Sequence, residues 1–125
     1  MEKSIRVLVA NHPRLMRDIV LTALSDQPDI EIVGEVVEES EIPESVKKTS
    51  PDFVVIALDR PGTRPDICDI LFREHPGVHV IALAHEINYV SCYWASLEIH
   101  TNNIEASEQG ILNAIRGKLV ANGAN

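Results

Sequence analysis

Imidazole, carboxylate, amide and hydroxyl side chains follow several short apolar segments of the chain. Asn11 and His12 follow the first of these segments, Asp59 the third, His85 the fourth and Thr101 the last. Imidazoles and carboxylates ligate zinc and other transition metals, while amides and hydroxyls hydrogen-bond small molecules. These residues therefore allow a ligand or metal site, provided that the fold brings them to one place.

The apolar segments are typical of strands, and the segments between them of helices. Short, β-branched apolar runs predict strands over 5–10, 30–36, 53–58 and 78–84, and a weaker fifth strand over 97–101. Helical spacing of apolar residues predicts helices near 15–24, 42–49, 67–74, 87–96 and 107–119, the last one capped by Ser107.

This alternation predicts an α/β domain of the flavodoxin-like class. The simplest arrangement is a doubly wound (βα)5 sandwich around a parallel five-stranded sheet of order 2-1-3-4-5. In such sheets the cleft lies at the carboxyl ends of the strands, where the first and third strands separate. The residues expected to line a possible ligand cleft are Asn11, His12, Ala57, Asp59, Ala84, His85 and Thr101.

A metal is the less favoured occupant of this cleft. Two loop histidines usually face solvent or hydrogen-bond within the protein. We predict no metal and no cofactor, and keep His12 and His85 as ligands of a transition metal as the alternative.

Length and charge restrict the possible partners. The 125 residues suit one domain, predicted over 1–119, with 120–125 as a tail or the start of a linker. A net charge of −8 disfavours direct binding of nucleic acid. The sequence shows neither a membrane-spanning run nor a secretory signal, so we expect a cytoplasmic protein with no membrane partner. Cys68 and Cys92 are expected to be reduced thiols.

Five segments of the chain resemble response-regulator receiver domains of the CheY-like superfamily, in particular those of helix-turn-helix transcription regulators. They are residues 7–18, 29–36, 51–62, 80–84 and 111–116. The resemblance implies a role in two-component signal transduction or phosphorelay. In such domains an acidic pair, an acceptor aspartate, a hydroxyl residue and a lysine carry out phosphotransfer with magnesium.

The chain departs from that pattern at every catalytic position. Asn11 and His12 replace the acidic pair, Ala57 the acceptor, Ala84 the hydroxyl residue and Ile104 the lysine. A methyl group cannot attack phosphorus, and an uncharged site does not hold magnesium. The resemblance therefore predicts a degenerate pseudo-receiver that is not an enzyme.

Asp59 offers one way to keep phosphorylation. It lies two residues after Ala57, and such a step keeps the same face of a strand. We keep residual phosphorylation at Asp59 as an alternative to a solvated loop aspartate.

Aromatic residues mark a possible protein interface. Tyr89, Tyr93 and Trp94 fall in the predicted fourth helix, and Ile111 and Ile115 in the last one. In receivers this region commonly mediates association, whereas the alternative is that these aromatic residues cover the sheet. We also note an acidic ridge, expected to be solvated and alternatively facing a basic partner, at Glu35, Glu38, Glu39, Glu41 and Glu44.

The sequence thus predicts a regulatory module that acts by association with a protein partner or as a homodimer, without a phosphorylation switch. It would serve signal transduction or transcription regulation. The alternative function is sensing of a small molecule or metal in the emptied cleft.

Overall fold

The chain forms a five-stranded sheet in a computed structural model that describes residues 4–60, 62–84 and 89–117. The strands are β1 (Ile5–Ala10), β2 (Ile30–Glu35), β3 (Phe53–Ala57), β4 (His79–Ala84) and β5 (Tyr89–Tyr93). Their order in the sheet is β2-β1-β3-β4-β5, as the sequence predicted. Strands β1 to β4 pair in parallel, whereas β5 pairs antiparallel with β4, so the expectation of a wholly parallel sheet is wrong.

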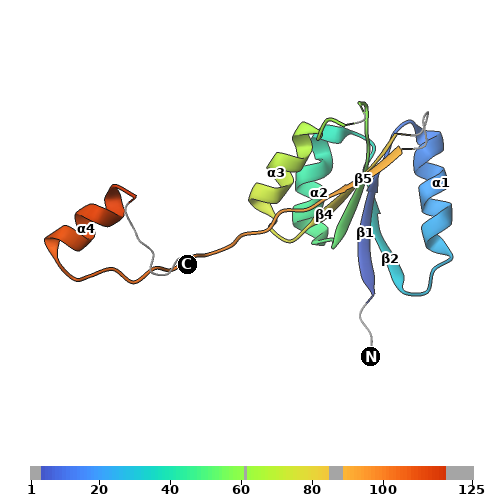
Figure 1. Cartoon of the computed structure of the whole chain (residues 1–125). Coiled ribbons are helices and arrows are strands. Elements are labelled where there is room, and N and C mark those ends of the chain that lie inside the picture. The colour runs from blue at the N-terminus through green and yellow to red at the C-terminus, as the bar shows by residue number, and fades with distance from the viewer. Residues whose placement is uncertain (1–3, 61, 85–88, 118–125) are drawn as a thin grey trace.

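Helices cover the two faces of this sheet unequally. Helix α1 (Arg14–Ser25) lies on one face, while α2 (Ile42–Thr49) and α3 (Asp66–Glu74) lie on the other (Figure 1). A short 3-10 helix, η1 (Glu39–Glu41), precedes α2. None of the described helices is long and apolar enough to span a membrane.

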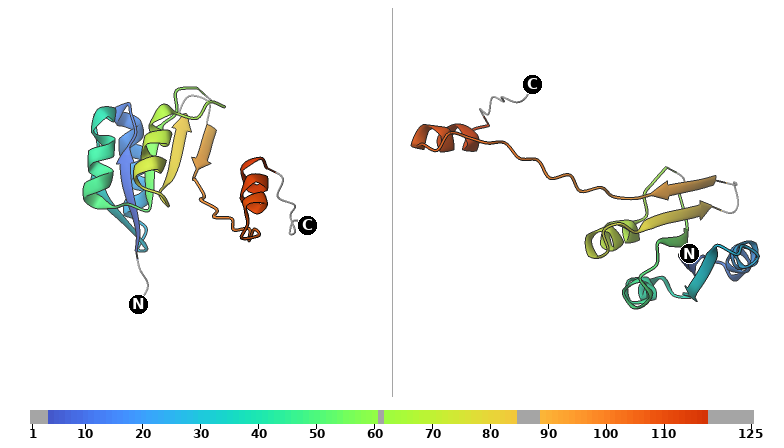
Figure 2. Two further views of the ribbon diagram at one scale, coloured as in Figure 1. Left: turned by 90° about the vertical axis from the view of Figure 1, so that its left-hand side faces the viewer. Right: turned by 90° about the horizontal axis from the view of Figure 1, so that it is seen from below.

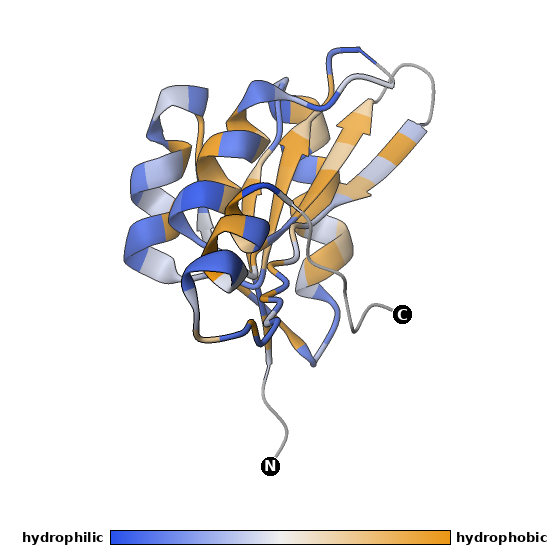
Figure 3. Cartoon of the chain, turned by 60° about the vertical axis from the view of Figure 1, so that its left-hand side comes forward, coloured by the Kyte–Doolittle hydropathy of each residue, from blue (hydrophilic) through white to orange (hydrophobic). Residues whose placement is uncertain are grey.

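The larger part of the core lies between the sheet and helices α2 and α3. Leu8, Val54 and Val80 from the strands pack there with Ile42 and Leu71 from the helices. On the opposite face a smaller cluster forms around Val7, Val9 and Val55 beneath α1. Figure 3 shows the strands as mostly hydrophobic and the helices as polar on their outer sides.

The strands and helices after β4 differ from the prediction. The helix predicted over 87–96 is wrong for its described part, because residues 89–93 form β5. Three of these five residues, Tyr89, Val90 and Tyr93, are aromatic or β-branched and favour strands. The strand predicted over 97–101 is wrong as well, since these residues have no partner in the sheet.

The chain leaves the sheet after β5 and ends in a separate helix. Residues 94–107, which we call the strap, run without regular structure to α4 (Glu108–Ile115), which stands clear of the sheet (Figures 1 and 2). The predicted cap of this helix is confirmed, because the N–H of Gly110 donates to Ser107 Oγ at 3.0 Å. Ile104 lies in the strap and does not end a strand.

Candidate functional site

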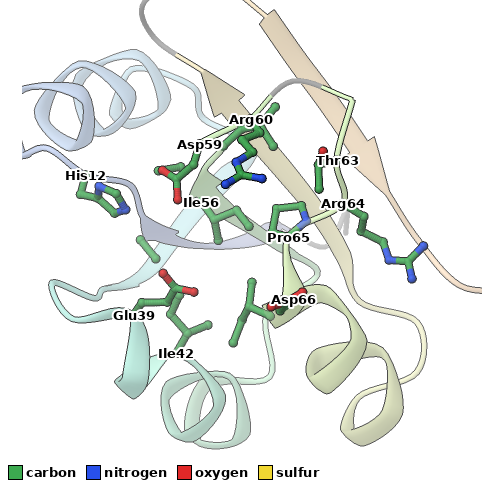
Figure 4. A pocket seen from close by; sticks show the side chains of 14 residues that line it. His12, Glu39, Ile42, Ile56, Asp59, Arg60, Thr63, Arg64, Pro65 and Asp66 are labelled. Carbon is green, nitrogen blue, oxygen red and sulfur yellow. The ribbon is translucent and has the colours of Figure 1, made fainter.

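A cavity of about 360 Å³ lies at the carboxyl ends of β1 and β3. The chain leaves β1 and β3 toward opposite faces of the sheet there, and the loop after β3 and the starts of α2 and α3 form the walls (Figure 4). Its lining residues are Ala10, His12, Glu39, Ile42, Ile56, Ala57, Leu58, Asp59, Arg60, Thr63, Arg64, Pro65, Asp66 and Ile67.

Three of the residues selected from the sequence meet at this cavity. His12 follows β1, Ala57 ends β3 and Asp59 follows β3, and each of them lines the cavity. Their meeting follows from the parallel pairing of β1 with β3, which brings both carboxyl ends to the same edge of the sheet.

Asn11 does not line the cavity and instead forms hydrogen bonds that connect the strands beside it. Its side chain is only 1% exposed, and its Nδ2 donates to the carbonyl oxygen of Ile56 at 3.0 Å. The backbone carbonyl oxygen of Asn11 accepts a hydrogen bond from Nη1 of Arg17 at 3.2 Å. Asn11 therefore links β1 to β3 and to α1.

The remaining candidates do not join this group. Ala84 ends β4 and is buried outside the cavity lining. Thr101 lies exposed in the strap, which leaves the sheet after β5. His85 lies outside the described residues.

The floor of the cavity is apolar, and charges of both signs surround it. Ala10 and Ala57 supply methyl groups at the strand ends, while Glu39 and Asp59 carry carboxylates on facing walls (Figure 4). Arg60 brings a guanidinium to the same rim. Such a site can bind a polar molecule through ion pairs, but its floor offers no nucleophile.

A second arginine at the rim is held in place. Arg64 Nε donates to Asp69 Oδ1 at 3.0 Å, and this hydrogen bond, with the carboxylate charge, raises the pKa of Arg64. Its charge is therefore permanent.

Among the residues that the structure describes, no three His, Cys, Asp or Glu side chains converge as ligands of a metal ion.

Sequence reasoning missed several residues of the cavity. Glu39 was taken as part of a solvated acidic ridge, and Thr63, Arg64 and Asp66 were not singled out. The Pro-Gly sequence after β3 was the available signal, because a loop at a strand's carboxyl end is where α/β proteins place their ligand contacts.

The aromatic cluster lies on a strand and its extension, which corrects its assignment to a helix. Tyr89 and Tyr93 are four residues apart on β5 and therefore share one face, where Tyr93 packs against the larger core. Trp94 follows β5 and stacks on His79, with ring centroids 5.7 Å apart and planes at 24°. The cluster thus divides between the two faces of the sheet.

Comparisons with known proteins agree with this architecture. No model of a protein family matches the chain. Over 57 residues, which are 46% of the chain, it is 30% identical to a protein-glutamate methylesterase/protein-glutamine glutaminase of Rhizobium etli. The matched segment is 16% of the length of that protein.

Two solved structures share the fold. One is the signal receiver domain of the response regulator NarL from Mycobacterium tuberculosis, with a TM-score of 0.58 and 23% identity over 66% of this chain and 68% of that one. The other is RcsB from Salmonella enterica serovar Typhimurium, bound to a promoter in the presence of a phosphomimetic, with a TM-score of 0.56 and 16% identity over 66% of this chain and 43% of that one. This chain has the fold of response-regulator receiver domains, as its resemblance to them predicted.

Proposed function

We propose that this chain is an atypical receiver-like regulatory module that acts by associating with a protein partner or a second copy, without phosphorylation of its cleft. The observation that carries the proposal is the methyl group of Ala57 at the end of β3, beside Asn11 and His12, which stand in place of an acidic pair after β1. A methyl group has no lone pair for attack on phosphorus and no charge for a cation.

The setting of Asn11 supports this proposal. Its amide donates to the Ile56 carbonyl inside the protein and so contributes to the strand framework. Magnesium prefers several hard oxygen ligands in octahedral geometry. A buried amide that is already engaged with the backbone is a poor substitute for a free carboxylate.

Exposed apolar side chains support association. Trp94, Leu97, Ile99 and Ile115 are 59%, 85%, 84% and 75% exposed. Apolar surface gathered in one part of a chain marks interaction sites. These residues belong to the strap and α4, so the module would signal through its C-terminal part in a two-component-type or transcription-regulating system.

The test combines phosphodonor treatment with measurement of association. The chain is incubated with acetyl phosphate and magnesium, and intact mass and sedimentation velocity are recorded over a range of concentrations. We expect no phosphoryl adduct and an unchanged association state. An adduct accompanied by a change in association would contradict the proposal.

Sensing of a small molecule is the second candidate function. The cavity has the volume of small-molecule sites, about 300 to 1,000 Å³, and its rim carries both carboxylates and guanidinium groups. A thermal-shift screen against metabolites and metals tests this function, because a ligand specific for the folded state raises the melting temperature. A hit that His12→Ala abolishes would favour sensing, whereas no hit would dismiss it.

A further inference from the structure

One face of the sheet is only half covered. Helix α1 places Val20, Leu21 and Leu24 over the smaller apolar cluster at β1 and β2. Farther along the same face, Ile81 and Leu83 of β4 are only partly buried. Val55 of β3 is still buried, so the less covered part of this face lies over β4 and the edge strand β5.

Strand β5 continues this open surface. Its antiparallel register sets Cys92 opposite Ile81 and Val90 opposite Leu83, and directly opposed residues lie on the same face of a sheet. Both Cys92 and Val90 are exposed. We call the surface the trough and define it by Phe53, Ile81, Leu83, Val90, Cys92 and Trp94.

Phe53 and Trp94 define the end of the trough. Both rings pack against His79, with centroids 5.0 Å and 5.7 Å from its imidazole. Trp94 nevertheless remains exposed on its outer side. The trough thus offers aliphatic and aromatic side chains side by side.

Helix α4 carries the matching apolar surface. Ile111, Leu112 and Ile115 recur at helical spacing, and Ile111 and Ile115 are exposed. An isolated helix of 8 residues is marginal in water, so α4 needs a surface to pack against. Both halves of a helix-on-sheet contact are therefore present in one chain, and within the described residues neither packs against the other.

The length and stiffness of the strap decide whether α4 packs in the trough of its own chain or in that of a second copy. Between Tyr93 and Asn102 the chain contains no glycine, proline, asparagine or aspartate, and Ser96 is its one residue of a type that is common in turns. Eight extended residues cover about 26 Å, which exceeds the length of the strands of this sheet. The chain therefore passes beyond its own sheet before it can turn, as Figure 2 shows.

We propose that α4 packs in the trough of a second copy, and that the second copy returns its own α4, forming a two-fold symmetric dimer by helix exchange. This inference rests on the proposed function, since it specifies the surfaces through which the module associates. Exchange of identical parts closes the assembly at two copies, because each trough is filled by the other chain.

A disulfide tests which chain supplies the helix. Cys92 lies in the trough, while Cys68 is fully buried and does not compete. Ile115→Cys places a thiol within the apolar face of α4, and Ile111→Cys is a second position. Asn113→Cys, on the opposite side of α4, is the matched control.

After mild oxidation, we expect Ile115→Cys to give a covalent dimer on a non-reducing gel, at a yield at least about fivefold above that of Asn113→Cys. A disulfide within one chain, seen as a monomer lighter by two hydrogens, would overturn the exchange. So would the absence of a disulfide, or equal yields from both variants. These outcomes leave the proposed function intact, because that function is judged by the phosphodonor experiment.

Discussion

Arg17 of α1 donates through Nη1 to the backbone carbonyl oxygen of Asn11 at 3.2 Å, and both side chains are buried. Asn11 in turn donates to the carbonyl of Ile56 in β3. Arg17 also lies 3.6 Å from a carboxylate oxygen of Glu35, in β2. One arginine thereby connects α1 to the carboxyl ends of β1 and β2 next to the cleft.

Replacing this arginine is expected to destabilise the fold. Arg17→Met keeps much of the side-chain volume but leaves the Asn11 carbonyl without its donor, which costs about 2 kcal/mol. Arg14→Met is the control, because Arg14 is exposed and forms only a surface ion pair with Asp18 at 3.7 Å. Such pairs contribute about 0.5 kcal/mol or less. Urea unfolding measures both variants, and equal losses would contradict the structural role of Arg17.

Restoring a carboxylate on the cavity floor is not expected to restore phosphorylation. Ala57→Asp would supply the nucleophile, but His12 and the engaged amide of Asn11 still stand in place of the acidic pair that binds magnesium. We expect no phosphoryl adduct after treatment with acetyl phosphate and magnesium. Intact-mass spectrometry gives the answer, and a stable adduct on this variant would show that the missing aspartate is the sole defect.

Asp59 is expected to remain unmodified in the native chain. It is exposed on the loop after β3, and among the described residues it belongs to no cluster of three or more His, Cys, Asp or Glu side chains that could hold a cation. Intact mass after phosphodonor treatment should therefore be the same for the native chain and for Asp59→Asn. A phosphoryl adduct on the native chain that disappears in Asp59→Asn would assign the acceptor to this position instead.

The two cysteines are expected to differ in reactivity. Burial raises the pKa of the Cys68 thiol from its ordinary 9.0 to about 11, whereas Cys92 is exposed on β5. At pH 8, iodoacetamide should modify Cys92 first and Cys68 only after unfolding. Mass spectrometry of peptides resolves the two sites, and rapid modification of Cys68 in the folded chain would contradict its burial.

The same thiol makes stability depend on pH. Above pH 9.0 the Cys68 thiol ionises in the unfolded chain but stays protonated in the folded one until about pH 11. The free energy of unfolding should therefore fall as the pH rises through this window. Cys68→Ala removes the contribution and is the control in urea titrations at pH 8 and pH 10.

The elements of the sheet could be predicted where the pattern of apolar residues fits only one type of secondary structure. The run that forms β3 is short and wholly apolar, the run of β1 is apolar except for Arg6, and α1 shows clear helical spacing. Residues 87–96 were ambiguous, because Tyr89 and Tyr93 share a face both on a helix and on a strand. Pairing with β4 decided in favour of the strand, and a tertiary contact of this kind leaves no signature in a local pattern.

The cleft was predictable from the rule that parallel strands present ligands at their carboxyl ends. This rule placed His12, Ala57 and Asp59 together. It could not place Glu39, which reaches the cavity from η1 in a segment whose acidic composition suggested only solvation. Thr101 was misplaced because its expected position depended on a parallel fifth strand.

Because β5 runs antiparallel to β4, the cavity and the start of the strap lie at opposite ends of the strands. A parallel last strand would deliver the chain to the edge of the sheet where the cavity opens, but the antiparallel strand delivers it to the other edge, next to the start of β4. A molecule bound beside Asp59 therefore does not meet the chain's own strap where the strap leaves the sheet. Cavity and trough are nevertheless joined through the strands, because Ala57 at the cavity pairs with Leu83 of the trough, so ligand binding and dimer formation can be coupled through β3 and β4.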